Sequence, residues 1–251
     1  IMSRDVIAVR TNTDQEEVAR IAGRYDLLAV PVVDERRRLV GIVTVDDVID
    51  VIKEEAAEDM LLMAGVRESD EETGSGRLLV PAKRLPWLLV TLLGGLGIAE
   101  LIHYFDPLLR QEALLAGFIP IVMGMEGNVG IQAATVTVRG IATGRIDGSL
   151  RRAVGNEVFN GVVLGVVFAI AIGGYCLVRF GHTGVAMSVA LAVVTGMTSA
   201  ALVGTLVPLT LRRLGIDPAI ATGPFVTTAM DVLGLSIYLT AATLFLGKFG
   251  A

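Results

Sequence analysis

Three acidic residues lie inside long apolar stretches of this sequence, where an ionised side chain is costly and by default marks a functional site. They are Glu100, Glu126 and Asp231. Asp231 is the only charged residue between positions 222 and 247, and no Lys or Arg lies at a comparable depth. It lies about nine residues into its stretch, or about 14 Å along a helix, and hence near mid-membrane. We therefore predict a water-filled cation pathway at Asp231, with Thr227 one turn earlier.

A second apolar stretch supplies neutral oxygen atoms. Asn128 and Gln132 are four residues apart, so they share one face of a helix. Glycines recur here at every third position: Gly124, Gly127 and Gly130. Small residues let helices approach closely and bring backbone carbonyls near a pathway. Tight helix packing alone would also explain the glycines, and both interpretations stay open.

A third group of candidates forms a strongly acidic segment with Lys53 as its only base. Seven of its fourteen residues are acidic: Asp46, Asp47, Asp50, Glu54, Glu55, Glu58 and Asp59. Spacings of three and four bring several of them onto one flank of a helix, where like charges repel. A divalent cation would relieve that repulsion, because hard cations such as Mg²⁺ prefer carboxylate oxygen. A solvated acidic face is the alternative.

The residue types favour a hard cation over a transition metal. Carboxylates and amides dominate, whereas His103 and His182 fall near the predicted outer surface and form no cluster with cysteine. Mg²⁺ keeps several of its waters, so one or two carboxylates with neutral oxygens would suffice. We expect no enzyme, because the sequence shows no nucleophile–base pair and no phosphate-binding glycine loop. We expect no nucleic-acid partner, because the net charge is −5 and many of the acids cluster between Asp46 and Glu72.

The composition divides the 251 residues into two parts. The chain is 53% hydrophobic and 19% charged, with a mean hydropathy of +0.67. Residues 1–84 are mixed, whereas residues 85–251 hold nearly all the long apolar runs. We predict an α-helical membrane protein with five transmembrane helices, preceded by a soluble α/β module. The predicted spans cover residues 86–105, 112–142, 153–178, 183–211 and 222–247.

The positive charges predict the orientation in a lipid bilayer. Nine Lys and Arg residues flank the spans on the side of the soluble module, against Arg110, Arg179 and Lys248 on the other side. By the positive-inside rule, the soluble module is cytoplasmic and the C-terminus is on the extracellular or periplasmic side of the cell (inner) membrane. The protein would thus be a multi-pass membrane protein.

The soluble module reads as strand, helix, two strands and a long helix. The pattern predicts strands at residues 6–9, 27–33 and 39–45, and helices at 13–25 and 46–65. Thr13 and Glu16 have the spacing of a capping box at the start of the first helix.

The motif "VPVVDERRRLVGIVTVDDVIDVI" resembles the second member of a CBS domain pair. We therefore assign a partial CBS domain to residues 1–52. The first member of the pair would lie outside this chain or on another subunit, so a sheet-and-helix face of this domain would be uncovered. Thr44 and Asp47 fit the Thr-x-x-Asp pattern with which CBS domains hold the ribose of an adenine nucleotide, so ATP is a candidate ligand. A strand end followed by a helix cap would use the same residues.

Together with "GNVGIQAATVTVRGIATG", "LRRLGIDPA" and "GPFVTTAMDVLGLSIYL", this motif resembles the MgtE family of magnesium channels. The resemblance implies a homodimer with one pore in residues 85–251, where Asp231 and Asn128 bind hydrated Mg²⁺. It also implies an acidic plug helix and linker at residues 53–84. The plug would bind Mg²⁺ and close the pore. The positions that match the family's acids in the plug and just before it are Asp47, Asp50, Glu55, Glu58 and Asp59.

The sequence departs from the family pattern at three positions beside the expected pore. Glu126 replaces a glycine, Ile131 replaces an asparagine, and Gly223 stands where the family commonly has asparagine. With Thr227 and Gln132, Glu126 and Gly223 are our predicted pore-lining residues. The extra acid leaves the preferred divalent cation open. A transporter that exchanges a divalent cation for Na⁺ or H⁺ is one alternative, and a membrane-anchored nucleotide-sensing CBS module without transport is another.

Overall fold

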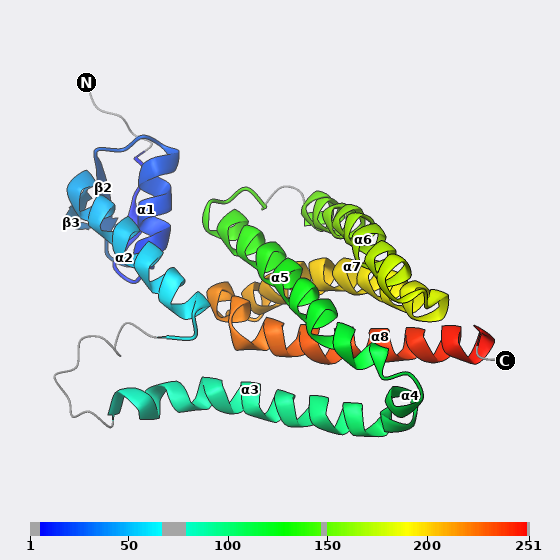
Figure 1. Cartoon of the computed structure of the whole chain (residues 1–251). Coiled ribbons are helices and arrows are strands. Elements are labelled where there is room, and N and C mark those ends of the chain that lie inside the picture. Colours follow the sequence, from blue (N-terminus) through cyan, green and yellow to red (C-terminus); the bar gives the residue numbers. More distant parts are fainter. Residues whose placement is uncertain (1–5, 67–78, 147–149, 250–251) are drawn as a thin grey trace. The chain divides into compact units, whose positions relative to one another are not determined.

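The computed structural model describes residues 6–66, 79–146 and 150–249. The chain forms two compact units, Ile1–Leu61 and Leu62–Ala251, and each is described here by itself (Figure 1). Much of the predicted linker before the first span falls at residues 67–78, outside the described residues.

The N-terminal unit is a small α/β fold on a three-stranded sheet. It contains β1 (Val9–Arg10), α1 (Gln15–Arg24), β2 (Ala29–Val33), β3 (Leu39–Thr44) and most of α2 (Val45–Met63). β2 lies in the middle of the sheet, parallel to β1 and antiparallel to β3. Small apolar side chains fill its core: Val9, Val18, Ala19, Ala22, Val30 and Val48. The predicted order of strands and helices is confirmed.

Two local details of this unit differ from the prediction. The first strand is only Val9–Arg10, because residues 6–8 do not pair with the sheet. The first helix is capped by Asp14, whose side chain accepts a hydrogen bond from the Glu16 backbone N–H at 2.9 Å. The Thr13 hydroxyl instead accepts from the backbone N–H of Arg10. The predicted capping box is therefore wrong by one residue.

The turn between β2 and β3 is organised by Asp34. Its carboxylate accepts hydrogen bonds from the backbone N–H groups of Arg36 and Arg38, and the Arg38 guanidinium pairs with it at 2.8 Å. The bonds from Arg38 hold the pKa of the Asp34 carboxyl below its usual value. Arg37 takes up the positive φ of 59° that the turn requires. This short connection fixes the register of β2 on β3.

Several large apolar side chains of β3 and α2 are exposed in the N-terminal unit. Leu39, Val40 and Ile42 of β3 are exposed by 58–67%, and Ile49 and Ile52 of α2 by about half. This is the uncovered sheet-and-helix face that we expect of one member of a CBS pair.

Among its described residues, the second unit contains five helices long and apolar enough to cross a membrane. They are α3 (Leu79–Tyr104), α5 (Leu114–Ala142), α6 (Leu150–Phe180), α7 (Thr183–Arg213) and α8 (Pro224–Phe249). The short helix α4 (Asp106–Gln111) joins α3 to α5, and the 3-10 helix η2 (Pro218–Thr222) precedes α8. All five predicted spans are confirmed, although α3 begins seven residues before the predicted start at Pro86.

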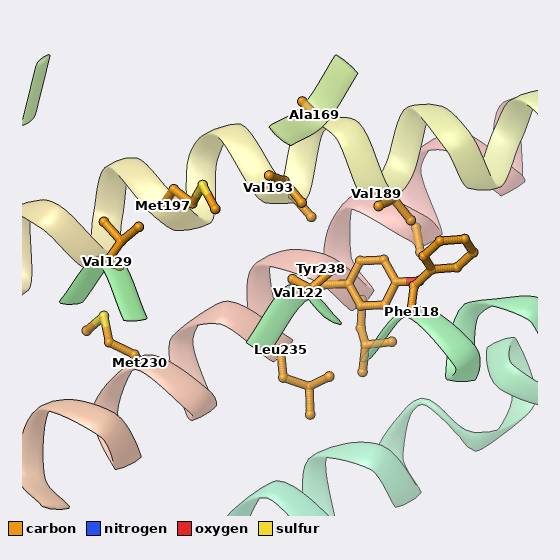
Figure 2. Packing of buried hydrophobic residues seen from close by; sticks show 14 of the residues in the cluster. Phe118, Val122, Val129, Ala169, Val189, Val193, Met197, Met230, Leu235 and Tyr238 are labelled. Atoms are coloured by element: carbon orange, nitrogen blue, oxygen red, sulfur yellow. The ribbon is translucent and has the colours of Figure 1, made fainter. Parts of the chain in front are cut away.

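Helix α7 lies at the centre of this unit and packs against α5, α6 and α8, whereas α3 packs mainly against α8 (Figure 1). Gly161 and Gly165 let α6 approach the α7 backbone, because a methyl group at either position would meet α7 main-chain atoms within 3.0 Å. The buried Tyr238 hydroxyl of α8 donates a hydrogen bond to the Leu115 carbonyl of α5 at 3.0 Å. Figure 2 shows the apolar core that these helices share.

Candidate cation site

Asp231 lies on α8, seven residues after Pro224, at the level of the shared apolar core. Its side chain is only partly buried. Within the described residues it accepts no hydrogen bond and pairs with no basic side chain. Thr227, one turn earlier, is partly buried, and its hydroxyl donates to the Pro224 carbonyl at 3.1 Å. An ionised side chain at this depth in a span is costly when it has no partner.

Glu126 lies on α5 and is almost completely buried, with 1% of its surface exposed. Neither carboxylate oxygen has a hydrogen-bond partner among the described residues. The carboxylate fills a slot between α7 and α8 that exists because both helices carry glycine there: a methyl group at Gly196 would overlap Oε1, and one at Gly234 would overlap Oε2. Asp231 is close enough to interact with Glu126 electrostatically. The structure thus brings together two of the three predicted intramembrane acids.

The two predicted amide ligands lie on a different face of α5. Asn128 and Gln132 are both exposed on the surface of this chain. Gln132 lines a cavity of about 320 Å³ between α5 and α6, together with Asn160. Gly130, by contrast, is a packing glycine, because a methyl group there would meet the Met230 side chain at 2.9 Å. The packing interpretation is thus supported for Gly130.

The cavity between α5 and α6 is also lined by an acid that our sequence reasoning missed. Glu157 lines the cavity next to Gln132 and also a neighbouring cavity of about 280 Å³ with Arg139 and Arg145. The Asn160 side-chain amide donates to Glu157 at 3.5 Å. Its position in the sequence was the available signal. Glu157 is the last charged residue before the uncharged run from 158 to 178 of the third span.

The acids of α2 are spread along an exposed helix. Asp47 accepts a hydrogen bond from the Thr44 hydroxyl at 2.9 Å, Asp50 pairs with Lys53 at 3.0 Å, and Glu55 accepts from the Gln15 amide at 2.8 Å. Glu58 and Asp59 lie one turn further on. In the described parts of the chain, no three acidic, histidine or cysteine side chains converge into a metal-binding group. The Thr44 backbone N–H also donates to the Asp47 carboxylate at 3.4 Å, as in the reciprocal bond of a capping box at the start of α2.

The end of α2 contacts the start of α8 within the second unit. A methyl group at Gly223 would meet the Met63 carbonyl at 3.4 Å, and one at Gly65 would meet the Pro224 ring at 3.5 Å. Leu62 packs in a small cluster with Val138 of α5 and Ala219 of η2. The buried Gly223, predicted to line the pore, therefore joins the acidic helix to the helix that carries Asp231.

Comparison with known proteins finds relatives that match nearly the whole chain. Residues 119–241 match the MgtE family model, described as a divalent cation transporter, and residues 1–54 match the CBS domain model. Curated relatives named magnesium transporter MgtE are 40% identical over 248 residues in Thermus thermophilus and 39% identical over 250 and 248 residues in Enterococcus faecalis and Bacillus subtilis. These matches cover 98–99% of this chain but 54–55% of each relative, so the chain spans about half of their length.

Proposed function

Because the chain belongs to the MgtE family of divalent cation transporters, we propose that it carries Mg²⁺ across the cell membrane along a pathway at Asp231. The observation that carries this proposal is the lone, partly buried carboxylate of Asp231 in the first third of α8, which has no basic partner among the described residues. Such a charge is tolerated in a bilayer only where water or an ion reaches it. A hydrated Mg²⁺ ion needs few direct ligands, which suits a sparse site of this kind.

We propose that two copies of the chain form one conduit around a two-fold axis. One copy offers a single Asp231, and its Asn128 and Gln132 side chains are exposed on a helix that crosses the membrane. Exposed amides are costly against lipid, so they favour a partner helix or water as their neighbour. A two-fold axis, the commonest symmetry of soluble homo-oligomers, would bring both sets of polar groups together.

We propose further that Mg²⁺ on the cytoplasmic side closes this conduit through α2. Its acids include Asp47, Asp50, Glu55, Glu58 and Asp59. No group on α2 alone is dense enough to hold a metal among the described residues, so a bound cation would be shared with groups contributed by another copy or another segment. The contact between residues 62–65 and the start of α8 supplies a mechanical connection from this helix to the pathway.

Orientation follows from the same proposal, with the N-terminal unit in the cytoplasm and the C-terminus outside. An adenine nucleotide at Thr44 and Asp47 is not included, because these two side chains already hydrogen-bond to each other.

Transport itself is tested by reconstituting the purified chain into liposomes that contain a fluorescent Mg²⁺ indicator. We expect Mg²⁺ to enter when its external concentration is raised and no Na⁺ or pH gradient is present. An absence of flux above that of empty liposomes would contradict the proposal. It would instead favour a membrane-anchored sensing module.

The buried carboxylate of Glu126 beside Asp231 favours a second candidate, a transporter that exchanges Mg²⁺ for Na⁺ or H⁺. The same liposomes separate the two mechanisms. Uptake that requires an opposing Na⁺ or pH gradient would establish exchange, whereas uptake that follows only the Mg²⁺ gradient and the membrane potential would establish a channel.

A further inference from the structure

The two cavities between α5 and α6 adjoin each other, because Val136 and Glu157 line both of them. The larger, of about 320 Å³, reaches Val129 and Leu164, toward the middle of the two helices. The smaller, of about 280 Å³, lies at the end of α5 and the start of α6. Each is close to the lower limit of ligand pockets, about 300 Å³. We call the two cavities together the α5–α6 slot.

The lining of the α5–α6 slot changes from apolar to basic along its length. Toward the middle of the helices it is mostly apolar, and Phe159 of α6 is exposed there by 67%. Gln132 and Asn160, one turn beyond the shared residues, add amide groups. At the other end the slot is lined by Arg139 and Arg145, and both are exposed. Apolar walls that lead to a basic end match the acyl chain, ester groups and phosphate of a phospholipid.

The turn after α5 holds Arg145 at the basic end of the slot. Its backbone N–H donates to the Gly140 carbonyl at 2.9 Å, and its side-chain Nε donates to the Thr143 hydroxyl at 3.3 Å. The next residue, Ile146, is buried and packs in a cluster with Leu209 of α7. The position of this arginine is therefore fixed by hydrogen bonds and packing rather than by an acidic partner.

The basic end of the slot has an unbalanced positive charge. Among the described residues, neither the Arg139 nor the Arg145 guanidinium pairs with a carboxylate. Glu157 also lines the slot, but it accepts a hydrogen bond from Asn160 instead. Two arginines and one glutamate leave a net charge of +1. A phosphodiester group carries one negative charge, and the planar guanidinium of arginine binds phosphate oxygens through paired hydrogen bonds.

We propose that the α5–α6 slot binds an anionic phospholipid. Arg139 and Arg145 hold its phosphate, and one acyl chain lies against Phe159 and Val163. Basic pockets between transmembrane helices on the cytoplasmic side bind anionic lipid head groups. In the proposed orientation, the basic end lies on that side. A free phosphate ion would use only the basic end of the slot, whereas a phospholipid uses its whole length. The inference adds a lipid partner to the proposed function and leaves the cation pathway unchanged.

The test measures lipid binding to the purified, detergent-solubilised chain by native mass spectrometry, as the fraction of protomers that retain one added lipid. The probes are phosphatidylglycerol, phosphatidylcholine and phosphatidylethanolamine with identical acyl chains. We expect wild type to bind phosphatidylglycerol about tenfold or more tightly than either zwitterionic lipid, because each basic residue near a membrane surface adds on the order of fivefold to the attraction of an anionic lipid. The double variant Arg139→Gln, Arg145→Gln should lose this preference.

Two single variants control for a general change in charge or folding. Arg213→Gln removes an exposed arginine at the end of α7, outside the slot, and should bind phosphatidylglycerol like wild type. Glu157→Gln raises the positive charge of the slot and should bind phosphatidylglycerol more tightly, which a folding defect would not produce. If the double variant does not fold, Arg139→Gln and Glu157→Gln carry the test, because they should change the affinity in opposite directions.

Three results would overturn this inference. They are equal binding of the anionic and zwitterionic lipids by wild type, unchanged phosphatidylglycerol binding by the arginine variants, and displacement of the lipid by inorganic phosphate at equal concentration. The last result would identify a site for a free anion rather than a lipid. Mg²⁺ uptake is a separate measurement, so a failure of the proposed pathway at Asp231 and a failure of the lipid site are distinguishable.

Discussion

At the scale of single residues, Glu126, Gly196 and Gly234 form one packing unit. The Glu126 side chain reaches into the space that a side chain at position 196 or 234 would occupy. The nearest atoms to a methyl group at Gly196 or Gly234 all belong to Glu126. Either glycine is therefore needed only while the glutamate is present.

This packing unit makes a prediction about stability. Gly234→Ala should destabilise the chain by about 1–3 kcal/mol, the usual cost of overpacking a core. The same substitution in a Glu126→Gly background should cost much less, because the colliding carboxylate is gone. The measurement is a double-mutant cycle on the thermal stability of the detergent-solubilised chain, in which contacting residues are expected to couple.

Gly155→Ala on α6 is the matched control for that cycle, because Gly155 is exposed and a methyl group there has no neighbour within 4 Å. It should leave stability unchanged or raise it slightly, since alanine favours a helix over glycine. Equal losses from Gly234→Ala in the two backgrounds would show that Glu126 does not occupy the slot.

Some of these residues were predictable from sequence and others were not. Asp231 stands out because a single charge in an apolar run has a cost that composition alone reveals. The burial of Glu126 was not predictable, because it depends on glycines seventy and more than a hundred residues away. The cap at Asp14 rather than Thr13 depends on a φ and ψ choice at one residue, and both residue types are good caps.

At the scale of elements, the last residues of α2 pack within the second unit. Its acids lie on an exposed surface, and its last turn packs with Leu62 against Val138 and Ala219. A change in the position of the last turn of α2 would therefore alter the packing at the ends of α5, η2 and α8. Closely packed elements transmit such shifts because protein interiors have low compressibility.

Neutralising the acidic helix tests whether it senses Mg²⁺. The triple variant Asp50→Asn, Glu55→Gln and Glu58→Gln should keep Mg²⁺ uptake high when the Mg²⁺ concentration on the cytoplasmic side is raised. Wild type should close under the same conditions, because a bound cation relieves the repulsion between its acids. Substituting Glu35→Gln, an acid in the β2–β3 turn outside α2, serves as the control for a general change in charge. Normal closure of the triple variant would leave α2 as a solvated acidic face.

The elements themselves followed from sequence more fully than their ends. The five spans were predictable because each needs about twenty apolar residues and few other structures contain such runs. The short helix α4 was missed because six residues carry too little periodicity to identify. The early start of α3 was missed because Pro86, a residue typical of a helical first turn, lies inside this helix.

At the scale of the whole molecule, the single chain leaves polar and apolar surfaces that an assembly would cover. Within the apolar window of α3 no residue is buried, and Asn128 and Gln132 of α5 are exposed. The N-terminal unit likewise exposes Leu39 and Val40. The proposed dimer, with contacts in both units, would cover these surfaces.

Disulfide cross-linking tests the proposed dimer. In a Cys176→Ala background, which removes the only native cysteine, Asn128→Cys should cross-link two copies in the membrane under oxidising conditions. Ile170→Cys, on the exposed surface of α6, should not, because lipid is expected there. A monomeric mass in mild detergent with full Mg²⁺ uptake, or cross-linking only through Ile170→Cys, would contradict the arrangement around Asn128.

The central claim is that a cation passes the carboxylate of Asp231, and replacing that carboxylate tests the claim most directly. Asp231→Asn keeps the size and hydrogen-bonding capacity of the side chain but removes its charge, whereas Asp231→Glu keeps the charge on a longer side chain. The measurement is Mg²⁺ uptake into liposomes by equal amounts of folded wild type and each variant. We expect the asparagine variant to lose most of the uptake and the glutamate variant to keep part of it with altered selectivity. Uptake by Asp231→Asn at the wild-type rate would contradict the claim.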